Sequence, residues 1–122
     1  KELAAMREEY RAKRQIVLDG LAGCPVLRLI EPQGVFYAFV DVRLTGLDSG
    51  EFADRLLDEE HVAVVPGEAF GEEGRGFVRL SYAGDAGELR EGVARLRAFA
   101  ERVWNPITGH HTATYHPMEV LA

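Results

Sequence analysis

The chain has 122 residues, of which 47% are hydrophobic and 28% are charged, and its formal net charge is -6 at pH 7. This length suits one ordinary domain, and the composition is that of a globular protein. No apolar run approaches the roughly 20 residues that cross a bilayer, and the negative charge argues against general nucleic-acid binding. We therefore expect neither a membrane nor a nucleic acid as a partner.

The single cysteine, Cys24, cannot form a disulfide within the chain, which is typical of a reducing compartment. It stands between Gly23 and Pro25, where a buried or half-buried thiol is a simpler interpretation than a nucleophile. The charged, amphipathic start of the chain is unlike a signal peptide. We expect a cytoplasmic protein.

The first predicted element is a helix that ends at Gly20 and Gly23. Its apolar residues recur at helical spacing and form one stripe: Leu3, Met6, Tyr10, Val17 and Leu21. The only lysines of the chain, Lys1 and Lys13, are assigned to the polar side of this helix. A short strand over residues 26–30 and a turn over 31–34 follow, because Pro and Gly favour a turn there.

A second strand is predicted over residues 35–42, where aromatic and β-branched residues dominate. Alternation assigns four residues to its core face: Phe36, Ala38, Val40 and Val42. Tyr37 and Asp41 then lie on the other face, free for solvent or a partner.

The next predicted helix follows Asp48, which has Glu51 three residues later, the spacing of a capping box. We expect it to bury three residues: Phe52, Leu56 and Leu57. A strand over 62–65 follows and ends at Pro66. A loop rich in Gly and Glu over 67–76 then leads to a strand over 77–82.

The last predicted helix has the same capping spacing at Asp85 and Glu88. It should bury five residues at steps of three and four: Leu89, Val93, Leu96, Ala100 and Val103. The whole order predicts an α+β fold, a small mixed or antiparallel sheet packed by helices. We expect one domain over residues 1–104 and a flexible tail over 105–122, since the periodicity fails after Trp104.

Arg79 is the main candidate for a functional residue, because a guanidinium within an apolar strand is costly to desolvate unless an anion pairs with it. Arginine suits a carboxylate, which it holds by two parallel hydrogen bonds. Alternation puts Arg79 on one face with Phe77 and Ser81. The alternative is an exposed arginine on the solvent side of a half-buried strand.

The chain also resembles the class I aminotransferases of pyridoxal-phosphate (PLP) fold type I, over about residues 1–103. Four segments carry the resemblance in the right order: Pro32 to Phe39, Val62 to Gly71, Gly76 to Ala83, and Glu91 to Leu96. Their family patterns are P-x-G-x-F-Y-x-F, V-P-G-x-x-F-G, R-x-S-[FY]-A and E-G-x-x-R-L. The residues of these motifs most resemble those of the aspartate-aminotransferase-like branch of the family.

The resemblance implies that the chain is the C-terminal small domain of a transaminase of amino-acid metabolism. In that family the residue that matches Arg79 binds the substrate α-carboxylate, and Phe36 matches an aromatic residue near the substrate. The loop over 67–76 would lie near the active-site entrance and help closure on substrate. The resemblance also implies a homodimer, with PLP bound by a large domain.

This chain itself shows no cofactor-binding residues and no catalytic residue, because neither Lys1 nor Lys13 has the context of a PLP lysine. We therefore expect it to be inactive alone. His110, His111 and His116 near Glu119 have ligand types that zinc accepts, but a segment without periodicity rarely offers a preformed site, so we expect no metal.

A different class of function uses the same features. A free-standing, non-catalytic α+β module could bind a small carboxylate ligand or a protein partner through Arg79 and the sheet. A module encoded alone should begin with its own start and helix cap, whereas this chain begins within a helical pattern. That start favours the transaminase domain.

Overall fold

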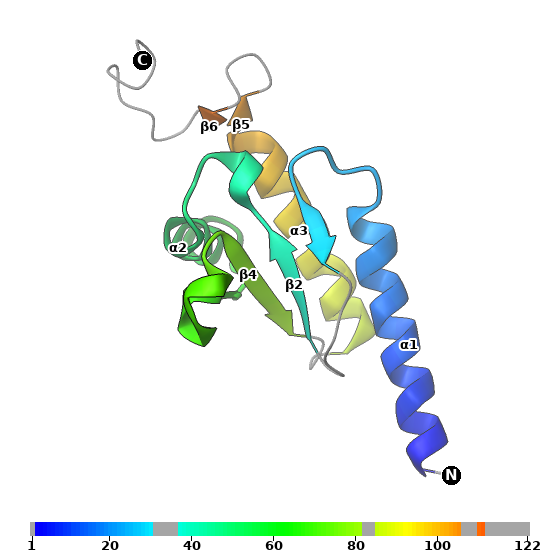
Figure 1. The fold of residues 1–122 in the computed structure, drawn as a ribbon. Helices are drawn as coiled ribbons and strands as arrows, with labels where there is room; N and C mark the ends of the chain where they lie inside the picture. The colour runs from blue at the N-terminus through cyan, green and yellow to red at the C-terminus, as the bar shows by residue number, and fades with distance from the viewer. Residues whose placement is uncertain (1, 31–36, 82–84, 106–109, 112–122) are drawn as a thin grey trace.

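The computed structural model describes residues 2–30, 37–81, 85–105 and 110–111, and its elements follow the predicted order (Figure 1). The helices are α1 (Glu2–Leu21), α2 (Ser49–Glu60) and α3 (Ala86–Val103). The strands of the main sheet are β1 (Arg28–Ile30), β2 (Tyr37–Asp41), β3 (Val65–Pro66) and β4 (Phe77–Ser81). Three short 3₁₀ helices occur in the connections: η1 (Arg43–Thr45), η2 (Gly67–Phe70) and η3 (Glu72–Gly74).

The four strands form one antiparallel sheet in the order β1-β2-β4-β3. The strands β2 and β4 lie at its centre and are paired from Tyr37 opposite Ser81 to Asp41 opposite Phe77. The strands β1 and β3 are its edges. The predicted α+β class is therefore confirmed, and every pairing that the structure describes in this sheet is antiparallel.

Side-chain caps start α2 and α3 where the sequence predicts them. The carboxylates of Asp48 and Asp85 accept hydrogen bonds from the backbone N–H groups of Glu51 and Glu88, each at 2.8 Å. Such a cap satisfies a backbone donor that the helix leaves free and contributes about 1 kcal/mol. The local sequence therefore determines where these two helices begin.

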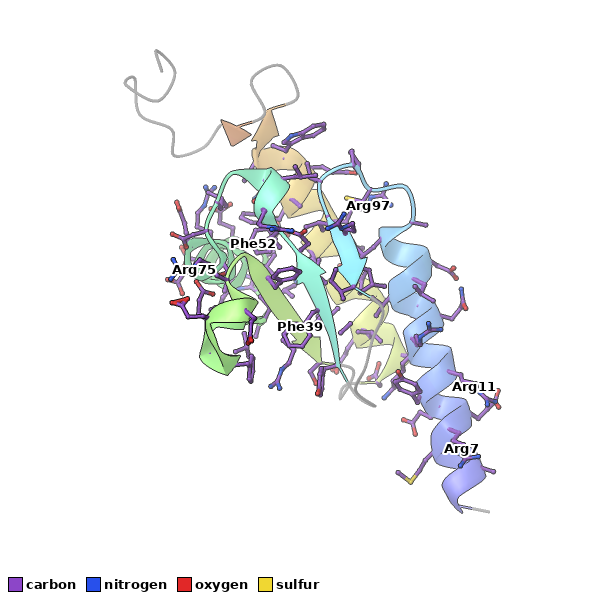
Figure 2. All side chains as sticks on the ribbon, viewed as in Figure 1. Arg7, Arg11, Phe39, Phe52, Arg75 and Arg97 are labelled. Carbon is purple, nitrogen blue, oxygen red and sulfur yellow. The ribbon has the colours of Figure 1, made fainter. Side chains whose placement is uncertain are left out.

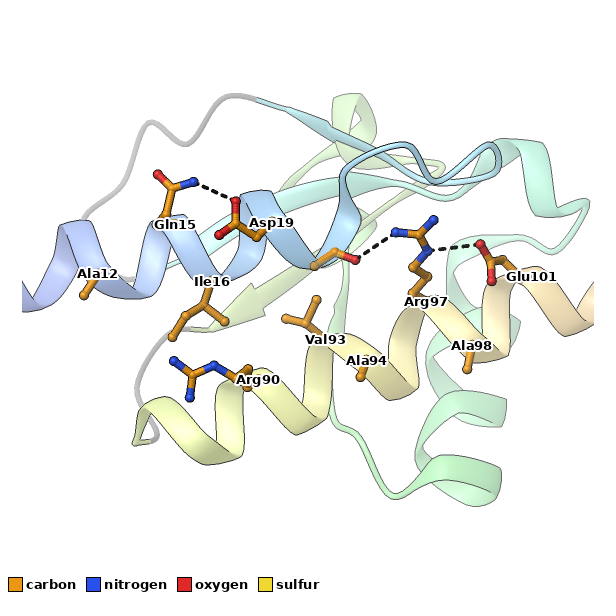
Figure 3. Close-up of a pocket in the computed structure, with 11 residues that line it drawn as sticks. Ala12, Gln15, Ile16, Asp19, Arg90, Val93, Ala94, Arg97, Ala98 and Glu101 are labelled. Atoms are coloured by element: carbon orange, nitrogen blue, oxygen red, sulfur yellow. Dashed lines mark hydrogen bonds and ion pairs between the residues drawn. The ribbon is translucent and has the colours of Figure 1, made fainter.

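One face of the sheet and the three helices enclose the apolar core. Alternation along β2 and β4 sends Ala38, Val40, Val78 and Leu80 to this side. The helices lie on the same side (Figures 1 and 3), and α3 buries all five residues predicted for it as well as Phe99. In the part of the chain that the structure describes, no α-helix covers the opposite sheet face.

Two apolar residues assigned to buried stripes are exposed instead. Leu57 is 53% exposed, because the buried stripe of α2 runs through Phe52, Ala53 and Leu56, and Leu57 lies beyond its edge. Met6 is 49% exposed, because the first turns of α1 project past the end of the sheet (Figure 1). Helical spacing defines a stripe, but the neighbouring elements decide how much of it is covered.

The assignment of Lys13 to the polar side of its helix was wrong. Lys13 lies three residues after Tyr10 and four before Val17, so it shares their face of α1. Its side chain is buried, and the ammonium pairs with a carboxylate oxygen of Glu9 at 3.1 Å. The aliphatic stem of a lysine can pack in such a position while its charged end meets a carboxylate.

The strand predicted over 62–65 is shorter and lies later in the chain. β3 contains only Val65 and Pro66, which pair with Arg79 and Val78 of β4. A proline is tolerated there because β3 is an edge strand, where a missing N–H removes no central ladder bond. Val62 is instead buried in the core outside any strand.

Three residues of the segment predicted as a tail are described: Asn105, His110 and His111. The short strand β5 (Trp104–Asn105) pairs with β6 (His110–His111) in a separate antiparallel ladder. The domain limit at residue 104 and the flexibility of the tail remain predictions.

Candidate functional site

Arg79 lies at the middle of the sheet on the face turned away from the helices. Its neighbours along β4, Val78 and Leu80, are buried in the core, so alternation directs the Arg79 side chain to the other face. It pairs with Phe39 of β2 on one side and with Val65 of β3 on the other. Arg79 is half-buried, so the alternative of a plainly exposed arginine does not describe it.

Two aromatic rings contact the Arg79 guanidinium. Its central carbon lies 4.2 Å from the centroid of the Phe70 ring and 5.0 Å from that of Tyr37, within the range of a cation–π contact. Phe39, labelled in Figure 2, meets Phe70 edge-on at 6.2 Å and Tyr37 edge-on at 6.0 Å between centroids. These four residues, Tyr37, Phe39, Phe70 and Arg79, form what we call the aromatic frame.

The described residues leave the hydrogen-bonding capacity of Arg79 unused. Among the described residues, none accepts a hydrogen bond from its guanidinium and no carboxylate forms an ion pair with it. A ring face attracts the positive charge but accepts no strong hydrogen bond, so the planar fork of N–H donors stays available. This arrangement suits an incoming carboxylate.

A hollow of about 270 Å³ adjoins the aromatic frame. Its lining is mostly apolar: Ile30, Phe39, Phe70, Glu73, Gly74 and Phe77. Since Phe39 and Phe70 belong to both the hollow and the frame, a ligand held by Arg79 has apolar surface beside it.

The segment predicted as a Gly- and Glu-rich loop folds into η2 and η3 and carries Phe70. The backbones of Gly67 and Gly74 approach so closely that a Cβ built on either would lie 2.1 Å from the other's carbonyl oxygen. The buried Ser49 hydroxyl donates to the Glu68 carboxylate, and this bond is the main cause that lowers the pKa of Glu68. The glycine contact joins η2 to η3, and the hydrogen bond from Ser49 attaches η2 to the first turn of α2.

Asp41 was expected to be free for solvent or a partner, but it is 7% exposed and already bound. The Arg43 side chain donates to both carboxylate oxygens, at 3.0 and 2.8 Å, and Arg28 adds a contact at 3.4 Å. The side-chain hydrogen bond from Arg43 lowers the pKa of Asp41, while burial acts in the opposite direction. Arg43 and Asp41 therefore satisfy each other, in contrast to Arg79.

A larger hollow, of about 740 Å³, lies between α1 and α3 (Figure 3). Its floor is formed by small and apolar residues such as Ile16, Val93 and Ala94. Arg97 at its rim is already engaged, since it donates to backbone carbonyls at the end of α1 and to Glu101. This hollow is on the helix side of the sheet, away from Arg79.

Sequence reasoning placed Arg79 on the correct face but missed the rings around it. Tyr37 and Phe39 follow from period-two alternation once β2 is paired with β4, whereas Phe70 gave no signal beyond its place in the Val65 to Gly71 motif. The other predicted substrate contact, Phe36, lies outside the described residues, so its role remains a prediction.

The described residues offer no site suited to PLP or a metal. Lys13 is buried in its ion pair with Glu9, so it is unsuited to form a Schiff base, and Lys1 lies outside the described residues. No group of three or more metal-ligating side chains occurs in the described part of the chain, and His116 and Glu119 are outside it. None of the described helices is long and apolar enough to cross a membrane.

Comparison with known proteins shows which enzymes this chain is similar to. The family model described as "Aminotransferase class I and II" matches residues 1–96. An arginine–pyruvate transaminase of Pseudomonas aeruginosa is 47% identical over 95 residues, which are 78% of this chain and 24% of that protein. An aspartate aminotransferase of Pyrococcus horikoshii is 39% identical over 101 residues, 83% of this chain and 26% of that protein.

Solved structures show the same fold. A crystal structure of an aromatic aminotransferase from Pyrococcus horikoshii has a TM-score of 0.77 at 40% identity, covering 83% of this chain and 27% of its own. An aspartate aminotransferase from Thermus thermophilus has a TM-score of 0.66 at 39% identity, and the match covers 75% of this chain and 23% of that one. The chain thus spans about a quarter of the length of the relatives it matches.

Proposed function

Because the chain belongs to the aminotransferase class I and II family, we propose that it is the C-terminal small domain of a transaminase. The whole enzyme would transfer an amino group between an amino acid and a 2-oxo acid. In it, Arg79 binds the substrate α-carboxylate. The contribution of this domain is to hold and orient the substrate, while the cofactor chemistry belongs to the rest of the enzyme.

The observation that carries the proposal is the environment of the Arg79 side chain. It is half-buried among aromatic rings, and no described residue neutralises its charge. Every α-amino acid and every 2-oxo acid has a carboxylate beside the reacting carbon. Two parallel hydrogen bonds from Arg79 would fix the direction of that carboxylate and hence of the reacting carbon, which is how positioning lowers a reaction barrier.

The remaining parts of the proposal rest on family membership. PLP would be bound by residues beyond this chain, since Lys13 is unsuited to hold it. The enzyme would be a homodimer with active sites that use both subunits. Its cytoplasmic location would rest instead on the single cysteine of the chain, Cys24. The names of three relatives give different substrates: arginine with pyruvate, aspartate, and aromatic amino acids. We therefore assign the choice of substrate side chain to the rest of the enzyme.

The test is Arg79→Ala in the full-length protein, with Arg75→Ala as the matched control. Arg75 is an exposed arginine at the end of η3 that pairs only with exposed Glu72 among the described residues. Loss of a charge-assisted pair of about 1.5–3 kcal/mol should lower kcat/KM for an amino acid roughly 10- to 150-fold, with PLP still bound. Unchanged kinetics in Arg79→Ala would remove Arg79 from the site.

The alternative of a free-standing binding module is favoured by the same observation, since an Arg79 that pairs with no described residue would serve a bound carboxylate equally well without catalysis. The intact mass of the native protein in its source cells separates the two. A chain several times longer than 122 residues that contains a PLP lysine supports the transaminase. A native chain of about this length supports the module.

A further inference from the structure

We propose that Phe70, assisted by Tyr37, is a positioning residue that holds the Arg79 guanidinium ready for the substrate carboxylate. This inference rests on the proposed function and extends it to residues that contact the clamp rather than the reacting atoms. It is carried by the contacts of the aromatic frame and by the anchoring of η2.

Packing in the hydrophobic core does not explain the position of the Phe70 ring. Phe70 is 47% exposed and lies on the sheet face opposite the helices, so it gains little from apolar burial. Its described ring contacts are instead with Arg79, at 4.2 Å, and with Phe39, edge-on at 6.2 Å. An exposed phenylalanine placed over a guanidinium is best explained by what it does to that guanidinium.

The Phe70 ring is also held in place. Gly67 and Gly74 pack backbone to backbone, and the Ser49 hydroxyl donates to Glu68, two residues before Phe70. A ring on a freely moving loop would have to be ordered each time substrate binds. An anchored ring restrains the long Arg79 side chain in advance, which avoids part of the entropic cost of ordering that side chain when substrate binds.

Aromatic neighbours hold an arginine without competing with its ligand. Arg43 shows the opposite arrangement, because Asp41 accepts from its Nε and from a terminal nitrogen and leaves little capacity for an anion. The ring faces of Phe70 and Tyr37 instead cover the guanidinium and exclude water from it, while its N–H donors stay free in their plane. A substrate carboxylate then meets a guanidinium that is already positioned, partly desolvated and not neutralised by any described residue.

The experiment compares Phe70→Leu, Phe70→Tyr and Phe70→Trp in the full-length holoenzyme, with Leu57→Ala as control for loss of an exposed apolar side chain on α2. Each enzyme is given an amino acid and, separately, the amine that lacks only its carboxylate. Conversion of the cofactor is followed by absorbance under single-turnover conditions. The amine reports on the active site without the interaction that Arg79 provides.

Phe70→Leu keeps an apolar side chain but removes the ring face. We expect it to lower kcat/KM for the amino acid about threefold to thirtyfold, the equivalent of roughly 0.5–2 kcal/mol for a cation–π contact. The rate with the amine should be unchanged. Phe70→Tyr and Phe70→Trp should restore the amino-acid rate, and Leu57→Ala should resemble the wild type.

The other outcomes separate the two proposals. If Arg79→Ala impairs the amino-acid reaction but Phe70→Leu does not, the positioning role is wrong and the clamp stands. Equal loss with the amino acid and the amine, or failure of tyrosine and tryptophan to restore activity, would show a general defect of η2 and also overturn the positioning role. If Arg79→Ala itself has no effect, the proposed carboxylate-binding role of Arg79 is wrong, and the positioning role that depends on it is wrong as well.

Discussion

Gly67→Ala should disrupt the loop that carries Phe70, because two stretches of backbone meet at this glycine. A Cβ at position 67 would lie 2.1 Å from the Gly74 carbonyl oxygen and 2.9 Å from the Phe77 carbonyl oxygen. Both obstacles are backbone atoms, so no side-chain rotation relieves the clash. The two segments must separate by about 0.9 Å before the shorter distance reaches 3.0 Å.

The expected destabilisation is about 1–3 kcal/mol, the usual cost of inserting a methyl group where there is no room. For a chain of this size, thermal unfolding followed by circular dichroism should show a midpoint lower by roughly 4 °C per kcal/mol. Gly92→Ala is the matched control, since nothing lies within 4 Å of a Cβ at this position of α3. It should stabilise the protein by about 0.5–1 kcal/mol through higher helix propensity.

Gly67→Ala should also lower the amino-acid activity of the full-length enzyme, because opening the contact with Gly74 moves η2 and with it Phe70. Gly92→Ala should leave that activity unchanged. A Gly67→Ala protein as stable as the wild type, with normal kinetics, would refute the reasoning, since it would mean that the two backbones do not touch in solution.

Asp41→Asn should remove an acid-sensitive part of the stability. Because the hydrogen bond from Arg43 lowers the folded-state pKa of Asp41, the stabilisation is fully present above about pH 4 and is lost as pH falls through the lowered pKa. Urea unfolding at several pH values should therefore show a gap of about 1–3 kcal/mol between wild type and variant at neutral pH that narrows in acid, and a gap independent of pH would contradict this. Added PLP should give only nonspecific lysine adducts with the 122-residue chain, because Lys13 is buried in an ion pair. A stoichiometric cofactor absorbance that responds to an amino acid would show that the chain holds its own cofactor site.

Features that depend on near neighbours in the chain could be predicted from the sequence. The caps at Asp48 and Asp85, the buried stripe of α3 and the outward face of Arg79 all follow from spacings of two to four residues. The family motifs added the expected role of Arg79, which local physics alone leaves open between a carboxylate clamp and an exposed side chain.

Features that depend on distant partners required the tertiary structure. The proline of β3 is tolerated because that strand is an edge, and Leu57 is exposed because none of the described elements covers its side of α2. Asp41 is buried because Arg43 and Arg28 converge on it.

The surroundings of Arg79 show most clearly which features follow from near neighbours in the chain and which need distant ones. Its strand and face follow from the sequence by itself, because alternation is a property of each strand alone. The rings of Tyr37 and Phe70 reach it only because β2 pairs with β4 and η2 folds back across the sheet edge. Period-two patterning determines which way a side chain points, but only the folded chain decides what it meets there.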